Sequence, residues 1–150
     1  IPFFVDMNKI FEDFVTRLFS KYFDDDEEII PQAKQKAWNV NESNRGGVSM
    51  IPDIVLKNKR NEITIIDAKC KEQLSSSDMA EIALYAKEFN IEKAVAVLPT
   101  YPGKTGMRWT SPDSGISIFE KRLDIEQVIV DLRNGYTGDI TKMIQGWVEL

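Results

Sequence analysis

The feature that most constrains the fold is a pair of apolar segments joined by a short polar stretch. The first segment covers residues 51–56 and the second covers residues 62–71, with only polar residues at 57–61 between them. Apolar residues of the second segment fall on both sides of an extended chain, which is typical of a strand buried between two layers. The pattern therefore predicts a β-hairpin whose second strand lies inside the molecule.

Charged residues interrupt this apolar hairpin at the ends of its strands. Asp53 opens the first strand, and Asp67 and Lys69 close the second. Asp67 and Lys69 are two residues apart, so both point to one face of the sheet. If the turn closes at its middle, Asp53 lies opposite Ile66 or Asp67. Three charged groups then converge at one place.

Facing carboxylates on neighbouring strands repel each other. A divalent cation that prefers oxygen ligands, Mg²⁺ or Mn²⁺, removes that repulsion. The alternative is that acidic residues and lysines simply end strands, as they do in many proteins. The spacing of Asp53, Asp67 and Lys69 favours the metal site over this alternative.

Composition limits the chemistry available to the chain. The sequence has 150 residues, enough for one domain over 1–150, and its first residue is Ile1, which suggests a fragment of a longer chain. It contains no histidine, which excludes histidine-based catalysis and most zinc sites. The single cysteine, Cys70, cannot form an internal disulfide, and no apolar run is long enough to cross a membrane. We therefore expect a cytoplasmic protein with no membrane partner.

A net charge of −5 argues against a stand-alone nucleic-acid binder, which is usually basic. It does not exclude a nuclease whose hold on DNA comes largely from a partner.

An amphipathic helix is predicted before the hairpin, over residues 6–22, with Asp6 as its N-cap. Its apolar stripe consists of Phe11, Phe14, Val15, Leu18, Phe19 and Tyr22. Glu12 lies at the border of this stripe, where it reaches either the edge of the core or the solvent. Residues 24–28 are acidic and predict a solvated loop.

A second helix is predicted after the hairpin, over residues 78–89. Asp78 and Glu81 have the spacing of a capping box, which gives both a structural explanation. Tyr85 lies one turn past Glu81 on the same side. The apolar strand at 92–98 then completes a βαβ crossover with a parallel strand pair.

The remaining segments carry weaker signals. We expect a strand at 33–40, a turn at 41–47, a long loop at 99–114, a strand at 115–125 and a last helix capped by Asp139. Residues 127–132 fit a helix or a strand. In the long loop, Lys104, Arg108 and Trp109 could steer and stack on a nucleic acid, and Trp109 could equally pack under the loop. The predicted architecture is an α/β fold with an αβββαβ core and a mixed central sheet flanked by helices.

Four blocks of the sequence resemble a known family. The αβββαβ order and the Pro-Asp…Asp-Ala-Lys spacing resemble the restriction-endonuclease-like fold of the PD-(D/E)XK nuclease superfamily. The segment at 8–15 looks like the N-K-[LI]-F-E-x-[YF]-V signature of the C-terminal nuclease domain of McrC-family restriction subunits, and 50–56 and 67–71 resemble its next two blocks. Asp78, Glu81 and Tyr85 match its D-x-x-Q-x-x-x-Y pattern, with Glu in place of Gln. The resemblance covers roughly residues 8–98.

The resemblance implies a Mg²⁺- or Mn²⁺-dependent DNA endonuclease of a modification-dependent restriction system. By that likeness, Asp53, Asp67 and Lys69 are catalytic. The metal ligands are then Glu12, Asp53, Asp67 and the Ala68 carbonyl. Lys71 and Tyr85 are candidates for substrate contact.

The McrC-like resemblance also implies two partners, DNA and an AAA+ NTPase motor subunit like McrB. Two alternatives remain from the sequence. One is a repair or junction nuclease of the same superfamily. The other is a non-catalytic adaptor with a nuclease fold.

Overall fold

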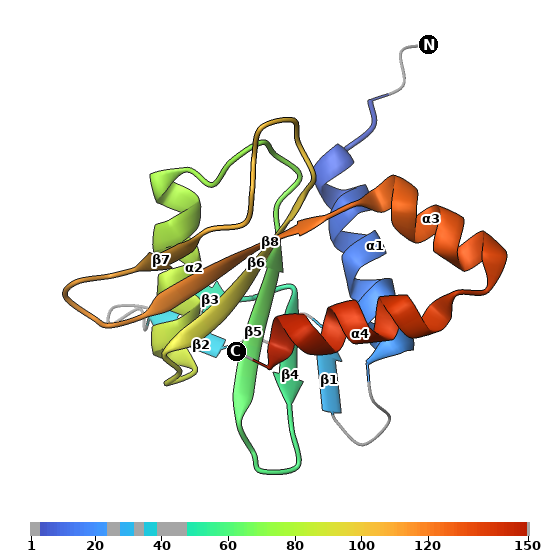
Figure 1. Ribbon diagram of the computed structural model, residues 1–150. Helices are drawn as coiled ribbons and strands as arrows, with labels where there is room; N and C mark the ends of the chain where they lie inside the picture. The colour runs from blue at the N-terminus through green and yellow to red at the C-terminus, as the bar shows by residue number, and fades with distance from the viewer. Residues whose placement is uncertain (1–3, 24–27, 32–34, 39–47, 150) are drawn as a thin grey trace.

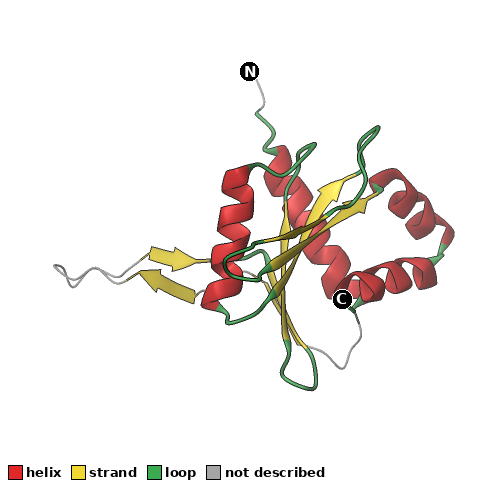
Figure 2. Cartoon of the chain, turned by 60° about the vertical axis from the view of Figure 1, so that its left-hand side comes forward, coloured by secondary structure: helices red, strands yellow, loops and turns green. Residues whose placement is uncertain are grey.

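The computed structural model describes residues 4–23, 28–31, 35–38 and 48–149. Six strands form one mixed sheet in the order β1-β4-β5-β6-β8-β7 (Figure 1). Their bounds are Glu28–Pro31 (β1), Ile54–Lys57 (β4), Ile63–Ala68 (β5), Lys93–Pro99 (β6), Arg108–Thr110 (β7) and Ser117–Leu123 (β8). Strands β2 (Gln35–Trp38) and β3 (Val48–Met50) form a separate two-stranded sheet that extends away from the main one (Figure 2).

The sheet changes from antiparallel to parallel pairing at β5. Strand β4 is antiparallel to both β1 and β5, whereas β5 is parallel to β6 and β6 is parallel to β8. Helix α2 (Ser76–Glu88) connects β5 to β6, because parallel neighbours need a crossover connection. The predicted hairpin and the predicted βαβ unit are both confirmed.

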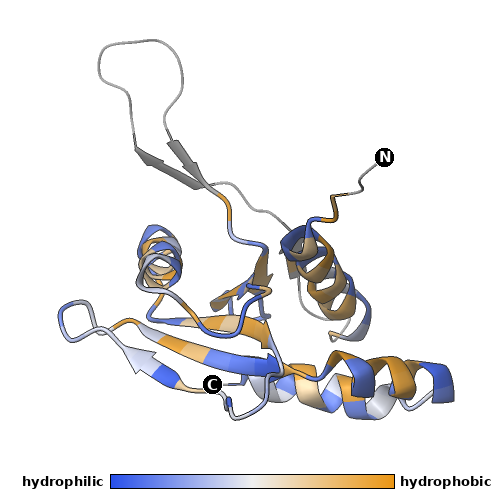
Figure 3. Cartoon of the chain, turned by 90° about the horizontal axis from the view of Figure 1, so that it is seen from above, coloured by the Kyte–Doolittle hydropathy of each residue, from blue (hydrophilic) through white to orange (hydrophobic). Residues whose placement is uncertain are grey.

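Helices cover both faces of the sheet. Helix α2 packs on one face, and α1 (Met7–Tyr22), α3 (Ile125–Asn134) and α4 (Thr137–Val148) pack on the other (Figure 1). Successive residues of β5 alternate between the two cores: Ile65 belongs to the α2 side and Ile66 to the α1 side. This alternation explains why β5 is apolar on both sides, and Figure 3 shows helices that carry hydrophobic residues on one side and hydrophilic residues on the other.

The N-terminal caps fix where the helices begin. As predicted, the Asp6 side chain caps α1 by accepting a hydrogen bond from the Lys9 amide at 3.1 Å. In α2 the N-cap is Ser75, whose hydroxyl accepts from the Asp78 amide at 3.1 Å while Asp78 Oδ2 accepts from the Ser75 amide at 2.8 Å. The prediction that Asp78 is the N-cap and forms a capping box with Glu81 is wrong. Ser75 and Asp78 have the same three-residue spacing as Asp78 and Glu81. Ser75 is the N-cap, so the helix begins three residues earlier than predicted.

The edges of the sheet also differ from the sequence prediction. The strand expected at 33–40 is β2, which pairs with β3, and the strand that pairs with β4 is β1, which begins at the last residue of the acidic run. The rest of that run, residues 24–27, and the turn expected at 41–47 lie outside the described residues.

Two further expectations for the C-terminal third are corrected. The long loop at 99–114 contains the short edge strand β7, and the undecided segment at 127–132 lies in α3. Asp139 is in the first turn of α4 and is not its cap, since the helix begins at Thr137. In the described part of the chain, no helix has the length and apolar character needed to span a membrane.

Replacing Ile144 with alanine should destabilise the protein strongly, because this α4 side chain is fully buried in the same core as α1 and β5. Loss of a buried isoleucine typically lowers the free energy of unfolding by about 2–5 kcal/mol. The matched control is Ile129→Ala on α3, where the side chain is 37% exposed. Chemical denaturation should separate the two variants. Equal losses would mean that α4 does not share the core.

Candidate active site

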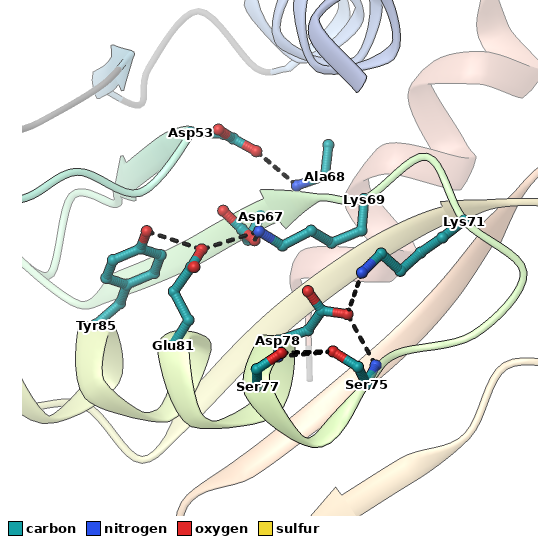
Figure 4. A network of polar contacts seen from close by, with 10 residues as sticks. All are labelled: Asp53, Asp67, Ala68, Lys69, Lys71, Ser75, Ser77, Asp78, Glu81 and Tyr85. Atoms are coloured by element: carbon teal, nitrogen blue, oxygen red, sulfur yellow. Dashed lines mark hydrogen bonds and ion pairs between the residues drawn. The ribbon is translucent and has the colours of Figure 1, made fainter. Parts of the chain in front are cut away.

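The turn of the β4–β5 hairpin sets which residues meet at its open end. Ile54 pairs with Ile66, so Asp53, just before β4, lies beside the end of β5. Asp53 Oδ2 accepts a hydrogen bond from the Ala68 amide at 2.7 Å (Figure 4). The sequence placed Asp53 opposite Ile66 or Asp67, and the register supports the second of these.

Lys69 joins two carboxylates from different elements. Its Nζ lies 3.1 Å from Asp67 Oδ2 on β5 and 2.9 Å from Glu81 Oε1 on α2. The backbone amide of Lys69 donates to the Val97 carbonyl at 2.9 Å, so pairing with β6 continues past the last residue of β5. This extended backbone keeps the side chains of Asp67 and Lys69 on the face that carries α2, as Figure 4 shows.

Burial dominates the electrostatics of the acidic pair. Removal from water raises the pKa of Asp53 to about 8, with a further contribution from the charge of Asp67. Burial likewise raises the pKa of Asp67, although the Lys69 ammonium opposes that shift. Burial alone would lower the pKa of Lys69, but the charges of Asp67 and Glu81 outweigh it and raise the pKa above its usual range. These shifts favour a proton on Asp53 and a charged Lys69.

The structure also brings Glu12 to this place. The Glu12 carboxylate on α1 is close enough to raise the pKa of Asp53 through its charge and a hydrogen bond. Its side chain is only 24% exposed, and it lies 3.6 Å from the Lys9 ammonium. Residues from α1, β4 and β5 thus meet at one end of the sheet.

The residues present fit an open site for a hard cation. Asp67 Oδ2 is one of two buried side-chain polar atoms in the described residues that lack a hydrogen bond, and its neighbour is the Lys69 ammonium, which pairs with it through charge at 3.1 Å. Among the described residues, no group of three or more His, Cys, Asp or Glu side chains is placed to hold a metal ion. Mg²⁺ needs no such cluster, since it usually takes one or two carboxylates and completes its shell with water and phosphate. Asp53 and Asp67 supply that donor set.

Glu81 is the site residue that the sequence analysis missed. Besides Lys69, its Oε1 accepts a hydrogen bond from the Tyr85 hydroxyl at 3.0 Å. Tyr85 is 8% exposed, and burial raises the pKa of its hydroxyl, so the hydroxyl remains the donor. The four-residue spacing of Glu81 and Tyr85 was the available signal, and the capping explanation concealed it.

The other candidate contact residues are held by the protein itself. Lys71 Nζ donates to Asp78 Oδ2 at 2.7 Å, which ties it to the start of α2 and not to Asp67. In the segment expected to meet nucleic acid, Trp109 Nε1 donates to Glu120 Oε2 at 3.3 Å and Lys104 Nζ to Gln73 Oε1 at 3.0 Å. Substrate contact by Lys71 and Tyr85 remains a prediction.

The element order and the mixed sheet are those of a restriction-endonuclease-like α/β fold. Comparison with protein-family models narrows this class. Residues 1–99 match the family described as McrBC 5-methylcytosine restriction system component. The match covers well over half of the chain, so the chain belongs to the McrBC family. The McrC-like resemblance seen in the sequence is confirmed.

A solved structure has the same fold. It is described as a refined half-complex from a tetradecameric assembly of Thermococcus gammatolerans McrB AAA+ hexamers with bound McrC. The superposition has a TM-score of 0.68 at 19% sequence identity and covers 97% of this chain. The chain spans 33% of the length of that similar chain. No curated protein sequence matches this one.

Without divalent cations, the protein should lose stability as the pH rises from about 4 to about 8. In that window the folded state keeps a proton on Asp53 that the unfolded chain has released, so the free energy of unfolding falls by up to about 1.4 kcal/mol per pH unit. Asp53→Asn should flatten this dependence in denaturation experiments at several pH values. Asp113→Asn, at an exposed loop position, is the control. An unchanged slope in Asp53→Asn would contradict the assignment.

Proposed function

We propose that this chain is the DNA-cleaving part of an McrBC-type restriction system and hydrolyses phosphodiester bonds with Mg²⁺ or Mn²⁺. The observation that carries the proposal is the convergence of Asp53, Asp67 and Lys69, with an under-coordinated Asp67 oxygen. Buried like charges at the end of a strand destabilise a fold, and a hard cation offsets that cost. Membership of a restriction-system family supports the same chemistry.

Each site residue has a role in this proposal. Asp53 and Asp67 would hold the cation, with Glu12 and the Ala68 carbonyl as further oxygen donors. The cation supplies Lewis acidity and charge neutralisation for an anionic transition state. The neighbouring carboxylates favour the ammonium form of Lys69, so in this arrangement Lys69 orients the attacking water or the scissile phosphate by donating hydrogen bonds and is not the base.

The net charge of the chain and its membership of the McrBC family both support a motor subunit as a partner. A chain of net charge −5 is poorly suited to capture DNA alone. The similar solved structure is described as McrC bound to McrB AAA+ hexamers. We propose that this chain likewise works with an AAA+ NTPase motor, which brings DNA to the site in the cytoplasm.

Asp67→Ala and Lys69→Ala should each abolish Mg²⁺-dependent DNA cleavage by the full-length chain assembled with its motor. Removal of a group that positions the reacting water typically costs about 10²–10⁴-fold in rate. Lys87→Ala, at an exposed position on α2, should cleave at the wild-type rate. Circular dichroism should show that all three variants remain folded. Cleavage that survives both site substitutions would contradict the assignment.

Metal binding can be measured separately from cleavage. Calorimetric titration with Mn²⁺ should show binding to the wild-type chain and little or none to Asp67→Ala, which lacks the central carboxylate. Binding should strengthen as pH rises towards 8, because Asp53 must lose its proton to become a ligand. If the wild-type chain binds no divalent cation even alongside its motor, the protein is a non-catalytic adaptor.

A further inference from the structure

The Lys69 ammonium pairs with two acidic side chains of the site. It lies 3.1 Å from Asp67 Oδ2 and 2.9 Å from Glu81 Oε1, so it connects β5 to α2 (Figure 4). The same Glu81 oxygen accepts the Tyr85 hydroxyl at 3.0 Å. Glu81 has no part in the helix cap, which consists of Ser75 and Asp78. The contacts that Glu81 makes with Lys69 and Tyr85 are therefore directed at the site.

A divalent cation held by Asp53 and Asp67 would compete with the Lys69 ammonium for the Asp67 carboxylate. Two positive charges a few ångströms apart in a partly buried site repel strongly. The bound cation would repel Lys69 from Asp67, and the lysine side chain is long enough to swing into solvent. Glu81 is the acceptor that remains to it, already in contact and outside the pair that receives the metal.

We propose that Glu81 is a positioning residue: it retains the Lys69 ammonium beside the site when a divalent cation replaces that ammonium on Asp67. This inference rests on the proposed metal-dependent function. Tyr85 in turn holds the Glu81 carboxylate in place through its hydroxyl. The Glu81 side chain is 42% exposed and would sample several rotamers, but the hydrogen bond from the buried Tyr85 hydroxyl selects one of them.

The test is the chemical reactivity of the Lys69 amine, measured by acylation and mass spectrometry on the full-length chain with its motor. Labelling is compared with and without saturating Mg²⁺. In the wild type, Mg²⁺ should change Lys69 labelling by less than about twofold, because Glu81 still holds the amine. In Glu81→Ala, Mg²⁺ should raise labelling by roughly tenfold, the scale expected from loss of a charged hydrogen bond.

Two controls separate this effect from a general loss of structure around the site. Lys71, which is paired with Asp78, should label equally in the wild type and Glu81→Ala. Glu88→Ala removes another glutamate from the same helix and should behave like the wild type. If Mg²⁺ has the same effect on Lys69 labelling in the wild type and Glu81→Ala, the proposal is wrong.

An absence of any Mg²⁺ effect in either protein also overturns it. Calorimetry then tells which idea has failed. If Mg²⁺ binds, only the role of Glu81 is wrong. If Mg²⁺ does not bind, the proposed metal site fails as well.

Cleavage kinetics give the second readout. Glu81→Ala should lower kcat by roughly tenfold and leave KM for DNA within about twofold, because Lys69 is misplaced while DNA binding by the complex is unaffected. Glu81→Gln keeps an oxygen that accepts from Lys69 and Tyr85, so it should recover most of the lost rate. A change in KM alone, or no recovery with Gln, would contradict a positioning role.

Discussion

The site depends on the confinement of β5. This strand is hydrogen-bonded to antiparallel β4 on one side and parallel β6 on the other. Apolar cores cover both of its faces, and Ile65 and Ile66 are fully buried. Asp67, the next residue, cannot move its charge into water without disrupting the sheet. The charge must be neutralised where it lies, by a proton, by the Lys69 ammonium or by a metal ion.

The same confinement explains why burial, more than any single charge, controls protonation at the site. Burying a carboxylate is costly unless it is paired. Here the packing of two hydrophobic layers stabilises the fold enough to keep Asp53 and Asp67 together despite the cost of burying them. The fold thus maintains an electrostatically unfavourable arrangement that water alone would not allow, and a hard cation relieves it.

Sequence periodicity was sufficient where structure is determined locally. The two-sided apolar pattern predicted β5, its hairpin partner and the parallel pair with β6, and the 3.6-residue stripe predicted α1. It failed for β1, because a four-residue strand beginning at Glu28 has little pattern of its own and is fixed by pairing with β4 far along the chain. It also failed at the start of α2, where Ser75 and Asp78 both offer capping side chains.

The sequence also predicted some of the residues that meet at the site and not others. The two-residue spacing of Asp67 and Lys69 and the hairpin register were enough to bring Asp53 to them. Family resemblance, more than spacing, singled out Glu12, and α1 does carry it to Asp53. Spacing did not connect Glu81 to Lys69, since the two residues are separated by a loop, and the family pattern has Gln at the position of Glu81. A complete local explanation for Glu81 was already at hand, and that explanation was wrong.

The tie between Lys71 and Asp78 has a consequence for how this chain can tolerate insertions and deletions. Asp78 binds both Lys71 and the Ser75 amide, so it fixes the start of α2 against the end of β5. Glu81 follows three residues later, about 4.5 Å along the helix axis. One extra residue between them would turn Glu81 by about 100° away from Lys69. The number of residues from 78 to 85 therefore determines whether Glu81 faces Lys69, and it matters as much as which residues they are.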